Sequence, residues 1–475
     1  QSEKESDKTK DLGEELADVI FVALCLANQT GVDLETAFYN KIKVKTERDK
    51  DRHQNNQKLQ FHPSQNIEEN HLNLSGSKSE SNRLLVLNAL LKGDIEICNL
   101  SNSQDTQLID KALSSTEEVV DIYHAGTAMR FLTAYFSLQE GRKTFLTGSA
   151  RMKERPIQIL VDALRDLGAD ITYAEQEGFP PLHIKGKKII KNEVTLSASI
   201  SSQYISALLL IGGFLENGIT IHLEGTITSL PYLNMTIQML NRVRIKAMWL
   251  KEQSIKVFPY KKETKMVTNV ESDWSSASYL YSIIALSKTG SLFMDTYFKD
   301  SLQGDKALVE IYRDYFNVDT EFILENNSKP QIRLTKGNKL LPSKIELDLN
   351  NCPDIAQTIL VTAVGLKIPF KLTGLSTLKI KETDRLVAMQ NELAKCNVQT
   401  EITEDSISLV SYEKNLPQTV KISTYNDHRM AMSFVPLALK GTNLIIENPN
   451  VVEKSYTNFW KDMKKLGFEI TKIEA

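Results

Sequence analysis

The chain of 475 residues is long enough for about three domains, and its 57 basic and 60 acidic residues give a net charge of −3. This balance excludes a generally basic nucleic-acid-binding protein, because binding to phosphate backbones requires a clear surplus of cations. With 41% hydrophobic and 25% charged residues, the composition is that of a globular protein and excludes disorder over most of the length.

Membrane insertion and secretion are also not expected. No apolar run approaches the roughly 18 residues that a membrane span needs, and the polar N-terminus lacks the apolar core of a secretion signal. The four cysteines lie far apart and form no CxxC pair, so neither a disulfide framework nor a cysteine zinc site is encoded. A reducing, cytoplasmic setting fits this pattern best.

Two helices are predicted before residue 41. The first stops at Gly31 and carries one broad apolar face, formed by Leu16, Val19, Ile20, Val22, Ala23 and Leu26. The second is capped by Asp33 and becomes almost wholly charged. A polar segment rich in Asn and Gln, with Pro63, follows at residues 54–73, and we interpret it as a linker between domains.

Residues 62–475 contain an internal repeat. Five times, an amphipathic helix ends at a residue type that tolerates the left-handed helix cap, and a strand-like run begins at once. These residues are 70 to 80 positions apart: Gly168, Asn241, Asn317, Asn397 and Gly467. A second series has six apolar helices that begin at polar clusters, such as "SKSESNRLLVLNAL" and "NDHRMAMSFVPLAL". The six starts predict six copies of one α/β unit of about 69 residues.

The starts of these helices predict anion binding. Taken singly, each is more typical of a buried helix with a good N-cap. As a set, however, they combine the positive end of a helix dipole and unpaired N–H groups with charged side chains. Those side chains are Lys78, Arg83, Arg130, Asp354, His428 and Arg429.

Further cations lie in two compact groups: Arg151, Lys153 and Arg155 in "ARMKERP", and Lys381, Glu382 and Arg385 in "KIKETDR". Lys381 and Arg385 are four residues apart, which predicts one shared face at the opening of a helix. A solvated, charged helix start would give the same pattern. Lys454 in "EKSYTNF" has by itself the character of an exposed lysine.

Six motifs follow one another along residues 62–475: "SGSKSESNR", "AGTAMR", "RMKERP", "SSQYISALL", "KETDR" and "YNDHRMAM". In order and spacing this part of the chain resembles the 3-phosphoshikimate 1-carboxyvinyltransferase family. The resemblance implies an α/β, two-domain enolpyruvyltransferase fold with six repeated βαβαββ-type units, preceded here by an N-terminal α-helical segment. We expect this segment at residues 1–58, one domain at 59–76 with 271–475, and the other at 77–270.

The resemblance also implies the reaction. The enolpyruvyl group of phosphoenolpyruvate is transferred to the 5-hydroxyl of shikimate 3-phosphate and phosphate is released, as a step of chorismate and aromatic amino-acid biosynthesis. No metal, redox cofactor, nucleic acid or membrane partner is expected. Both substrates carry a phosphate and a carboxylate, and Arg binds two oxygens of such groups at once, which explains the many cations.

The motifs assign residues to these roles. The catalytic residues would be Lys78, Asp354, Glu382 and His428, with Asp354 accepting the proton of the 5-hydroxyl and Glu382 delivering one to the enol methylene. Phosphoenolpyruvate would be bound by Lys78, Arg151, Arg385, Arg429 and Lys454. Shikimate 3-phosphate would be bound by Ser79, Arg83, Ser201, Ser202, Gln203, Ser229, Tyr232, Asp354 and Lys381.

Three positions depart from the family pattern. His124 replaces a frequent Asn, Phe131 a frequent Pro and Thr377 a common Asn. The reaction class is not affected, whereas the sensitivity to glyphosate is left open. Gly126 keeps the small residue expected where glyphosate would lie.

Two alternative functions share some of these features. The UDP-N-acetylglucosamine enolpyruvyltransferases share the fold and the donor, but typically carry a reactive cysteine or aspartate in a mobile loop near "GSARMKERP". This chain has no cysteine between Cys98 and Cys352. A non-catalytic anion-binding scaffold would need the loss of a catalytic group, and all four are in place.

The N-terminal segment resembles the C-terminal half of MazG-like nucleotide pyrophosphohydrolases. Glu15 and Asp18 match that family's ExxD motif and lie one helical turn apart. On the carboxylates alone, an exposed acidic helix face is the more typical interpretation; with the resemblance, we expect a remnant of a Mg²⁺ site without pyrophosphohydrolase activity. The apolar face of this segment is expected to be covered by a second copy of the chain or by the transferase domain.

Overall fold

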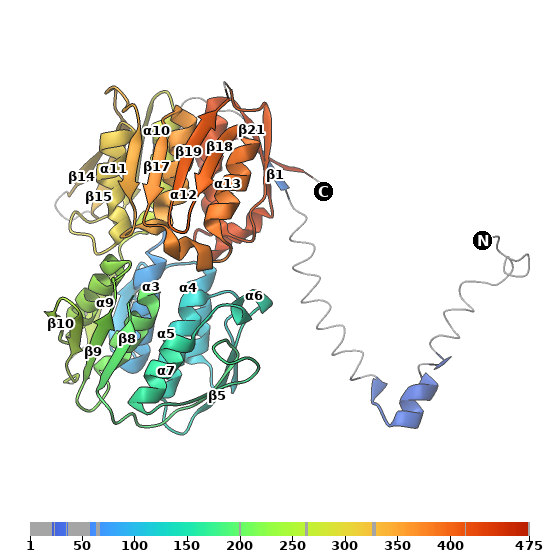
Figure 1. Cartoon of the computed structure of the whole chain (residues 1–475), viewed down its shortest axis with the longest axis vertical. Helices are drawn as coiled ribbons and strands as arrows, with labels where there is room; N and C mark the ends of the chain where they lie inside the picture. The colour runs from blue at the N-terminus through green and yellow to red at the C-terminus, as the bar shows by residue number, and fades with distance from the viewer. Residues whose placement is uncertain are drawn as a thin grey trace, which may run out of the picture. The chain divides into compact units, whose positions relative to one another are not determined.

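The computed structural model describes residues 21–22, 24–34, 36, 58–62, 67–198, 201–261, 265–324, 329–413 and 415–473 (Figure 1). The chain divides into two units, one formed by residues 1–57 with 474–475 and the other by residues 58–473. None of the helices in the described ranges is long and apolar enough to cross a membrane.

Little of the N-terminal unit lies in the described ranges. Residues 21–22 and 24–30 are helical, and the helix ends at Gly31, which has a left-handed φ of 66° as predicted. Asp33 caps the next turn, because its carboxylate accepts hydrogen bonds from the Thr36 amide and hydroxyl. Glu15 and Asp18 lie outside the described residues, and so do Leu16, Val19, Ile20 and Ala23 of the predicted apolar face. Self-association through this segment stays a prediction.

The described residues of the C-terminal unit form six sheets, in agreement with the predicted six α/β copies. Two copies follow the order βαβαββ without interruption in the half of the unit that is lower in Figure 1. The first consists of β4 (Val119–Asp121), α5 (Gly126–Ser137), β5 (Lys143–Thr147), α7 (Gln158–Leu167), β6 (Asp170–Tyr173) and β7 (Leu182–Lys185), with the short α6 (Ala150–Lys153) inserted. The second consists of β8 (Glu193–Ser197), α8 (Ser202–Gly212), β9 (Ile219–Glu224), α9 (Leu230–Arg242), β10 (Ala247–Lys251) and β11 (Ser254–Val257).

The upper half contains two copies of the same order. One consists of β16 (Ile345–Asp348), η3 (Pro353–Ile355), α12 (Ala356–Leu366), β17 (Phe370–Thr373), η4 (Ser376–Ile380), α13 (Arg385–Lys395), β18 (Val398–Ile402) and β19 (Ile407–Tyr412). The other consists of β20 (Thr419–Ile422), α14 (His428–Ser433), η5 (Val435–Lys440), β21 (Asn443–Glu447), η6 (Pro449–Lys454), α15 (Phe459–Lys465) and β22 (Ile470–Ile473), completed by β1 (Lys58–Phe61), which lies between β21 and β22.

The two remaining copies exchange their first strands. The strand β2 (Ile67–Leu72) pairs in parallel with β13 in the upper half, although the chain continues from β2 into the lower half. That upper copy is completed by α10 (Trp274–Leu286), β13 (Gly290–Asp295), η2 (Gly304–Ala307), α11 (Leu308–Tyr315), β14 (Val318–Ile323) and β15 (Gln331–Lys336). The lower copy consists of α3 (Lys78–Leu90), β3 (Ile95–Cys98), α4 (Gln104–Ser114) and β12 (Met266–Asn269), with β12 parallel to β3.

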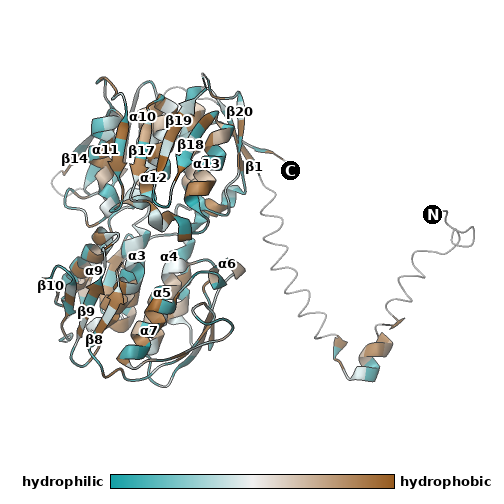
Figure 2. Cartoon of the chain, viewed as in Figure 1, coloured by the Kyte–Doolittle hydropathy of each residue, from teal (hydrophilic) through white to brown (hydrophobic). Residues whose placement is uncertain are grey.

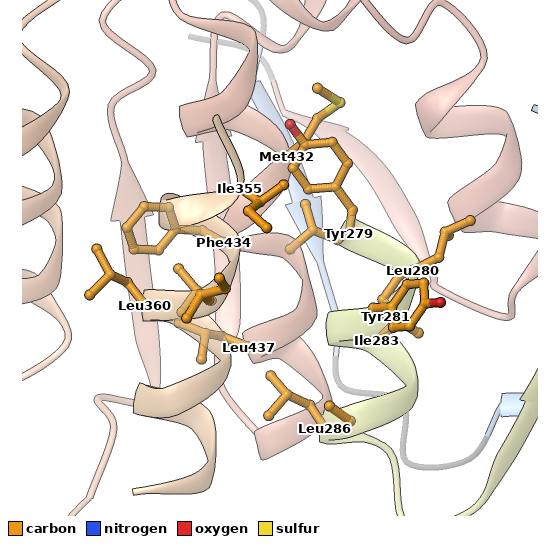
Figure 3. Close-up of a cluster of buried hydrophobic side chains, with 14 of the residues drawn as sticks. Tyr279, Leu280, Tyr281, Ile283, Leu286, Ile355, Leu360, Met432, Phe434 and Leu437 are labelled. Atoms are coloured by element: carbon orange, nitrogen blue, oxygen red, sulfur yellow. The ribbon is translucent and has the colours of Figure 1, made fainter. Parts of the chain in front are cut away.

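Each half has its own hydrophobic core. One core takes its buried residues from positions 59–74 and 274–468, the other from positions 84–270. Figure 3 shows part of the first core, to which α10 contributes Tyr279 and Leu286, α12 contributes Leu360, and the segment after α14 contributes Phe434 and Leu437. In Figure 2 hydrophobic residues recur along the helices and strands of both halves. We propose residues 59–76 with 271–475, and residues 77–270, as the two domains.

Two boundaries predicted from the sequence are wrong: the start of the C-terminal unit and the end of one helix. Residues 54–73 were interpreted as a linker, but Lys58–Phe61 and Ile67–Leu72 are strands of the upper half. The reason is burial on one face, since Leu59 and Phe61 alternate with partly exposed residues and enter the core.

The second error concerns one helix end. Gly168, Asn317, Asn397 and Gly467 have the predicted left-handed backbone, but α9 continues through Asn241 and the left-handed residue is Arg244. The side chain of Asn241 instead bonds both backbone groups of Ala247.

Candidate active site

The first helix of each of the six α/β copies, called here the inner helix, begins at one cavity. Its lining includes residues from the start of each: Lys78 and Ser79 of α3, Gly126 and Thr127 of α5, Ser202 and Gln203 of α8, Ser275 and Ser276 of α10, Asp354 just before α12, and His428 and Arg429 of α14. In these α/β units the inner helix follows the carboxyl end of a strand, so all six helix starts face the same side of their sheets. The cavity is therefore built by three units from each half.

Most of the predicted residues meet here. All of those assigned to the transferase line the cavity except Arg151 and Lys454. The helix dipoles and the lysines and arginines together make it a site for anions.

Arg83 is held rigidly at the lower side of the cavity. Its guanidinium donates to the Thr236 hydroxyl at 2.7 Å, the Ser79 carbonyl at 2.8 Å and the Ser206 hydroxyl at 3.2 Å. Burial lowers its pKa to about 10, which still leaves it charged at neutral pH. Its carbon Cζ lies 5.3 Å from the centre of the Phe131 ring. Phe131, which stands where the family often has Pro, therefore makes a cation–π contact with this arginine.

Asp354 lies at the centre of a cationic cluster. Its carboxylate is 3.0 Å from Arg385 Nη1, 3.1 Å from Arg429 Nη2 and 3.6 Å from Lys381 Nζ. Burial alone would raise the pKa of Asp354, but Arg429, Lys381, Arg385 and Lys78 outweigh it and hold the pKa well below its usual value. Asp354 is therefore an ionised carboxylate that could accept a proton.

Arg385 connects three carboxylates while its own side chain is almost completely buried. It bonds Asp427 at 2.7 Å and Glu382 at 2.9 Å, besides Asp354. Lys381 does not lie on the same helix, contrary to the sequence prediction, because α13 begins only at Arg385 with Asp384 as its N-cap. Both cations nevertheless reach Asp354.

Lys454 is not the exposed lysine that its sequence context suggests. Only 5% of the residue is exposed, and Nζ lies 2.5 Å from Glu382 Oε1. Burial would raise the pKa of Glu382, but Lys454 and Arg385 hold it well below its usual value. Lys454 thus acts at the edge of the cavity through a carboxylate that lines it.

His428 is buried at the start of α14 and lines the cavity. Neither ring nitrogen has a hydrogen-bond partner among the described residues. Burial, reinforced by Lys78, lowers the pKa of His428 well below its usual value, so the ring is neutral. Buried polar atoms are normally paired, and a bound molecule would supply the missing partner.

The polar residues expected to hold shikimate 3-phosphate cluster on the lower half and at its border with the upper half. Ser201 caps α8 by accepting from the Gln203 amide, and the Gln203 side chain donates to the Thr127 hydroxyl. Ser229 has a left-handed backbone with φ of 54°. The Tyr232 hydroxyl donates to Asp354 at 3.5 Å, and burial raises the pKa of Tyr232 well above its usual value, which leaves it a hydrogen-bond donor.

The motif "ARMKERP" places a different arginine in the cavity from the one predicted. Arg155 lines it, whereas the Arg151 side chain is 49% exposed, pairs with Glu154 and donates from Nε to the Glu382 carbonyl at 3.2 Å without lining the cavity. Burial, reinforced by Arg130, lowers the pKa of Arg155 to about 10. The phase of α6 could not decide between the two arginines, because the helix ends at Lys153 and Arg155 follows in a turn.

Gly126 shows how closely this part is packed. A Cβ atom at this position would lie 2.4 Å from Nη1 of Arg155, so any larger residue must displace the guanidinium. Besides Phe131, two residues depart from the family pattern, and only one of them lines the cavity. His124 bonds the Ser149 hydroxyl and does not line the cavity, whereas Thr377 does.

Sequence reasoning also missed several residues of the lining. Asp105 of α4 lies 3.5 Å from Lys78 Nζ, and Arg130 donates to the carbonyls of Gly126 and Pro156. The sequence singled out Arg130 as an unusual charge at a helix start but gave it no role. Asp105 and Tyr279 carried no signal, because an acidic residue in a first turn and an aromatic residue in an apolar helix are both common.

The comparisons with known proteins agree with this geometry. The model of the EPSP synthase (3-phosphoshikimate 1-carboxyvinyltransferase) family matches residues 63–115 and 109–463, and that of the MazG nucleotide pyrophosphohydrolase domain matches residues 3–53. A 3-phosphoshikimate 1-carboxyvinyltransferase from Bacteroides fragilis is 46% identical over 400 residues, which cover 84% of this chain and 95% of that protein. One from Haemophilus influenzae is 34% identical over 433 residues, covering 83% and 96%.

Solved structures show the same fold. EPSP synthase from Acinetobacter baumannii superposes with a TM-score of 0.70 at 20% identity, covering 88% of this chain and 100% of that one. The enolpyruvyl transferase NikO from Streptomyces tendae superposes with a TM-score of 0.65 at 12% identity, with the same coverage. The fold, the sequence identity and the matched motifs lead to one conclusion: residues 58–473 make this chain a member of the EPSP synthase family, the 3-phosphoshikimate 1-carboxyvinyltransferases.

Proposed function

We propose that the chain transfers the enolpyruvyl group of phosphoenolpyruvate to the 5-hydroxyl of shikimate 3-phosphate and releases phosphate. The observation that carries this is the convergence of six helix starts, with their lysines and arginines, on one cavity. Two substrates that each bear a phosphate and a carboxylate need such a surplus of fixed donors to be bound together away from water.

The cations divide into two groups around the cavity. Arg155, Arg385, Arg429, Lys78 and the neighbouring Lys454 would hold the donor. Arg83, Lys381 and the hydroxyl groups of Ser79, Ser201, Ser202, Ser229 and Tyr232 would hold the acceptor, with the amide of Gln203. Asp354 contacts Lys381 and Arg429, one cation from each group, at the place where the two substrates would meet.

The first half of the reaction adds the acceptor to the donor. Asp354 would accept the proton of the acceptor's 5-hydroxyl while the hydroxyl oxygen attacks C2 of the donor. A second group would protonate C3, which becomes a methyl group. We assign this second role to Glu382. In the second half a methyl proton would return to Glu382 as the bond between C2 and the bridging oxygen breaks, and phosphate would leave with that oxygen and with the proton that Asp354 took up.

Whether Glu382 is protonated depends on whether phosphoenolpyruvate is bound. In this structure Lys454 and Arg385 keep the carboxylate ionised. A bound phosphate and carboxylate would neutralise these cations, which removes the main reason for the low pKa, so Glu382 can take up a proton once the site is loaded. His428, neutral and unpaired in the described structure, is placed to hydrogen-bond the intermediate.

An acceptor panel tests the proposal. Phosphate release from phosphoenolpyruvate should require shikimate 3-phosphate and should stay at background with shikimate or with UDP-N-acetylglucosamine. Release with the sugar nucleotide would replace the assignment by that of the sister enolpyruvyltransferases. Release without any acceptor would indicate a phosphatase.

For residues 3–53 we propose a relationship to the MazG nucleotide pyrophosphohydrolase domain, whose model matches them. Glu15 and Asp18, three positions apart in the sequence, would be candidate carboxylate ligands of Mg²⁺, which prefers near-octahedral oxygen ligands.

A further inference from the structure

Two crossings of the chain lie side by side between the halves. One leads from β2 into α3, the other from β12 into α10. The Ser77 amide donates to the Glu271 carbonyl at 2.7 Å, and the Asp273 amide donates to the Ser75 carbonyl at 3.3 Å. Gly76 and Ser272 form a bridge between the same two segments. Any relative movement of the halves must act on this pair of crossings.

Two glutamates are buried at this place and have no part in the proposed reaction. Glu80 and Glu271 are each 1% exposed. The side-chain amide of Gln303, from the upper half, donates to Glu80 Oε1 at 2.9 Å, to Glu271 Oε2 at 3.4 Å and to the Ser272 carbonyl at 3.0 Å. Its oxygen accepts from the Trp274 amide at 2.9 Å. One glutamine thus joins both carboxylates and the second crossing.

The two carboxylates are solvated unequally by the protein. Glu271 accepts from the Trp274 indole at 2.7 Å, from the Phe298 amide at 2.8 Å and from the Ser301 hydroxyl, in addition to Gln303. Glu80 accepts one good hydrogen bond, from Gln303, and a long one of 3.5 Å from the Glu271 amide. Burial raises the pKa of both groups, but at Glu271 the hydrogen bonds from Ser301, Phe298 and Trp274 oppose it. A carboxylate with several donors is the one that stays ionised, so we take Glu80 to be the member that binds a proton.

No cation neutralises the pair. Within the described ranges neither carboxylate forms an ion pair. Arg242 at the exposed end of α9 acts on both from a distance, and Arg83, three residues after Glu80 on α3, interacts with Glu80 electrostatically while its guanidinium bonds other groups. The other charged groups on helices packed against α3 are engaged elsewhere or exposed, as Asp110 and Lys111 of α4 are. Asp105 of α4 lies at Lys78, Arg130 of α5 bonds two backbone carbonyls, and α8 carries no charged side chain.

We propose that Glu80 is a positioning residue whose neutral form keeps the first turn of α3, and with it Lys78 and Ser79, in the catalytic geometry. Lys78 and Ser79 directly precede Glu80 at the start of α3, so a displacement of the Glu80 carboxyl moves both. When Glu80 ionises, two like charges share one amide donor in a buried setting and repel each other. The turn then shifts, and transfer slows as the pH rises. This inference rests on the proposed function for its kinetic readout only.

The direction of the pH effect follows from burial. Burial, reinforced by Glu271, raises the pKa of Glu80 to about 7, above the ordinary value of 4.5. Between these two values the folded chain binds more protons than the unfolded chain, so stability falls as the pH rises through this window. Above it the loss is complete and constant.

The test compares wild type with Glu80→Gln, a neutral residue of the same size, and with Glu252→Gln, an exposed control. Differences between variants cancel the titration of the substrates themselves. We expect kcat/KM of wild type and of the control to fall roughly tenfold per pH unit above about pH 7. The kcat/KM of Glu80→Gln should not show this decrease, which we call the kinetic limb. The melting temperature of Glu80→Gln should exceed that of wild type by a margin that grows between about pH 5 and pH 7.5.

A second variant gives an independent reading. Gln303→Leu removes the donor that lowers the pKa of Glu80, so its kinetic limb should move to higher pH. Identical pH profiles for wild type, Glu80→Gln and Gln303→Leu would overturn the proposal. The melting temperatures decide it even if the proposed reaction were wrong, because a constant margin between Glu80→Gln and wild type at every pH would show that Glu80 does not titrate.

Discussion

Replacing Glu382 by glutamine is expected to lower kcat by roughly 100-fold or more, because glutamine keeps the size of the side chain but cannot carry the proton to and from C3. The donor KM should change much less. Lys454 and Arg385 lose a negative partner but keep an oxygen to bond. Steady-state kinetics with both substrates varied separate the two effects.

The matched control is Glu154→Gln, since Glu154 pairs with Arg151 on the exposed side of the same region and its side chain is 62% exposed. It should retain the kcat of wild type. A melting curve for each variant excludes unfolding as the cause of a loss. Near-normal kcat for Glu382→Gln would show that another group, with His428 as the nearest candidate, performs the proton transfer at C3.

Arg155→Gln and Arg151→Gln are expected to differ sharply, although the two arginines stand four residues apart in one motif. Removing a buried, substrate-facing guanidinium should raise the donor KM at least about 30-fold, because charged groups hydrogen-bonded away from water contribute about 2 kcal/mol or more. Arg151→Gln should stay within about threefold, because Arg151 makes an exposed ion pair with Glu154 and a hydrogen bond to the Glu382 carbonyl at a partly exposed site, and neither contributes much.

The measurement compares the KM for phosphoenolpyruvate of Arg155→Gln with that of Arg151→Gln. The KM for shikimate 3-phosphate of each variant serves as an internal reference. Equal effects of the two substitutions would place both side chains at the donor. A larger effect of Arg151→Gln would mean that the sequence motif identifies the donor ligand better than the cavity does.

The fold could be predicted from the sequence to a large extent, because its signals are local and repeated. Residues Gly168, Asn317, Asn397 and Gly467 end helices at the expected places, where a left-handed residue is required. Asn241 failed for a physical reason. An Asn at the end of a helix can either adopt the left-handed backbone or use its amide, and here the amide bonds Ala247 while Arg244 makes the turn.

The exchange of strands β2 and β12 between the halves could not be predicted from local patterns; only the domain bounds that the family resemblance implies place residues 67–72 and 266–269 in opposite halves. Their pairing partners lie more than a hundred residues away in the chain, and the polar sequence of β2 looks like a linker. Among the residues of β2 whose burial the structure describes, Ile67 and Leu72 are the ones that enter the core.

The site was predictable as a set of residue types but not as a set of contacts. Motifs carried the identity of Asp354, Glu382 and Arg385, and the structure brings these together. The burial of Lys454 depends on the carboxylate of Glu382, which is distant in sequence. The choice between Arg151 and Arg155 depends on how one turn packs over Gly126, and no spacing rule contains that information.

The central claim is that the bond broken is the C–O bond between the enolpyruvyl carbon and the bridging oxygen. Phosphoenolpyruvate labelled with ¹⁸O at the bridging oxygen tests it in one reaction with shikimate 3-phosphate, followed by ³¹P NMR and mass spectrometry. The account predicts that all of the label leaves with inorganic phosphate, in a one-to-one ratio with an unlabelled enolpyruvyl ether of the acceptor. Label retained in pyruvate, with phosphate formed by cleavage of the P–O bond, would contradict it.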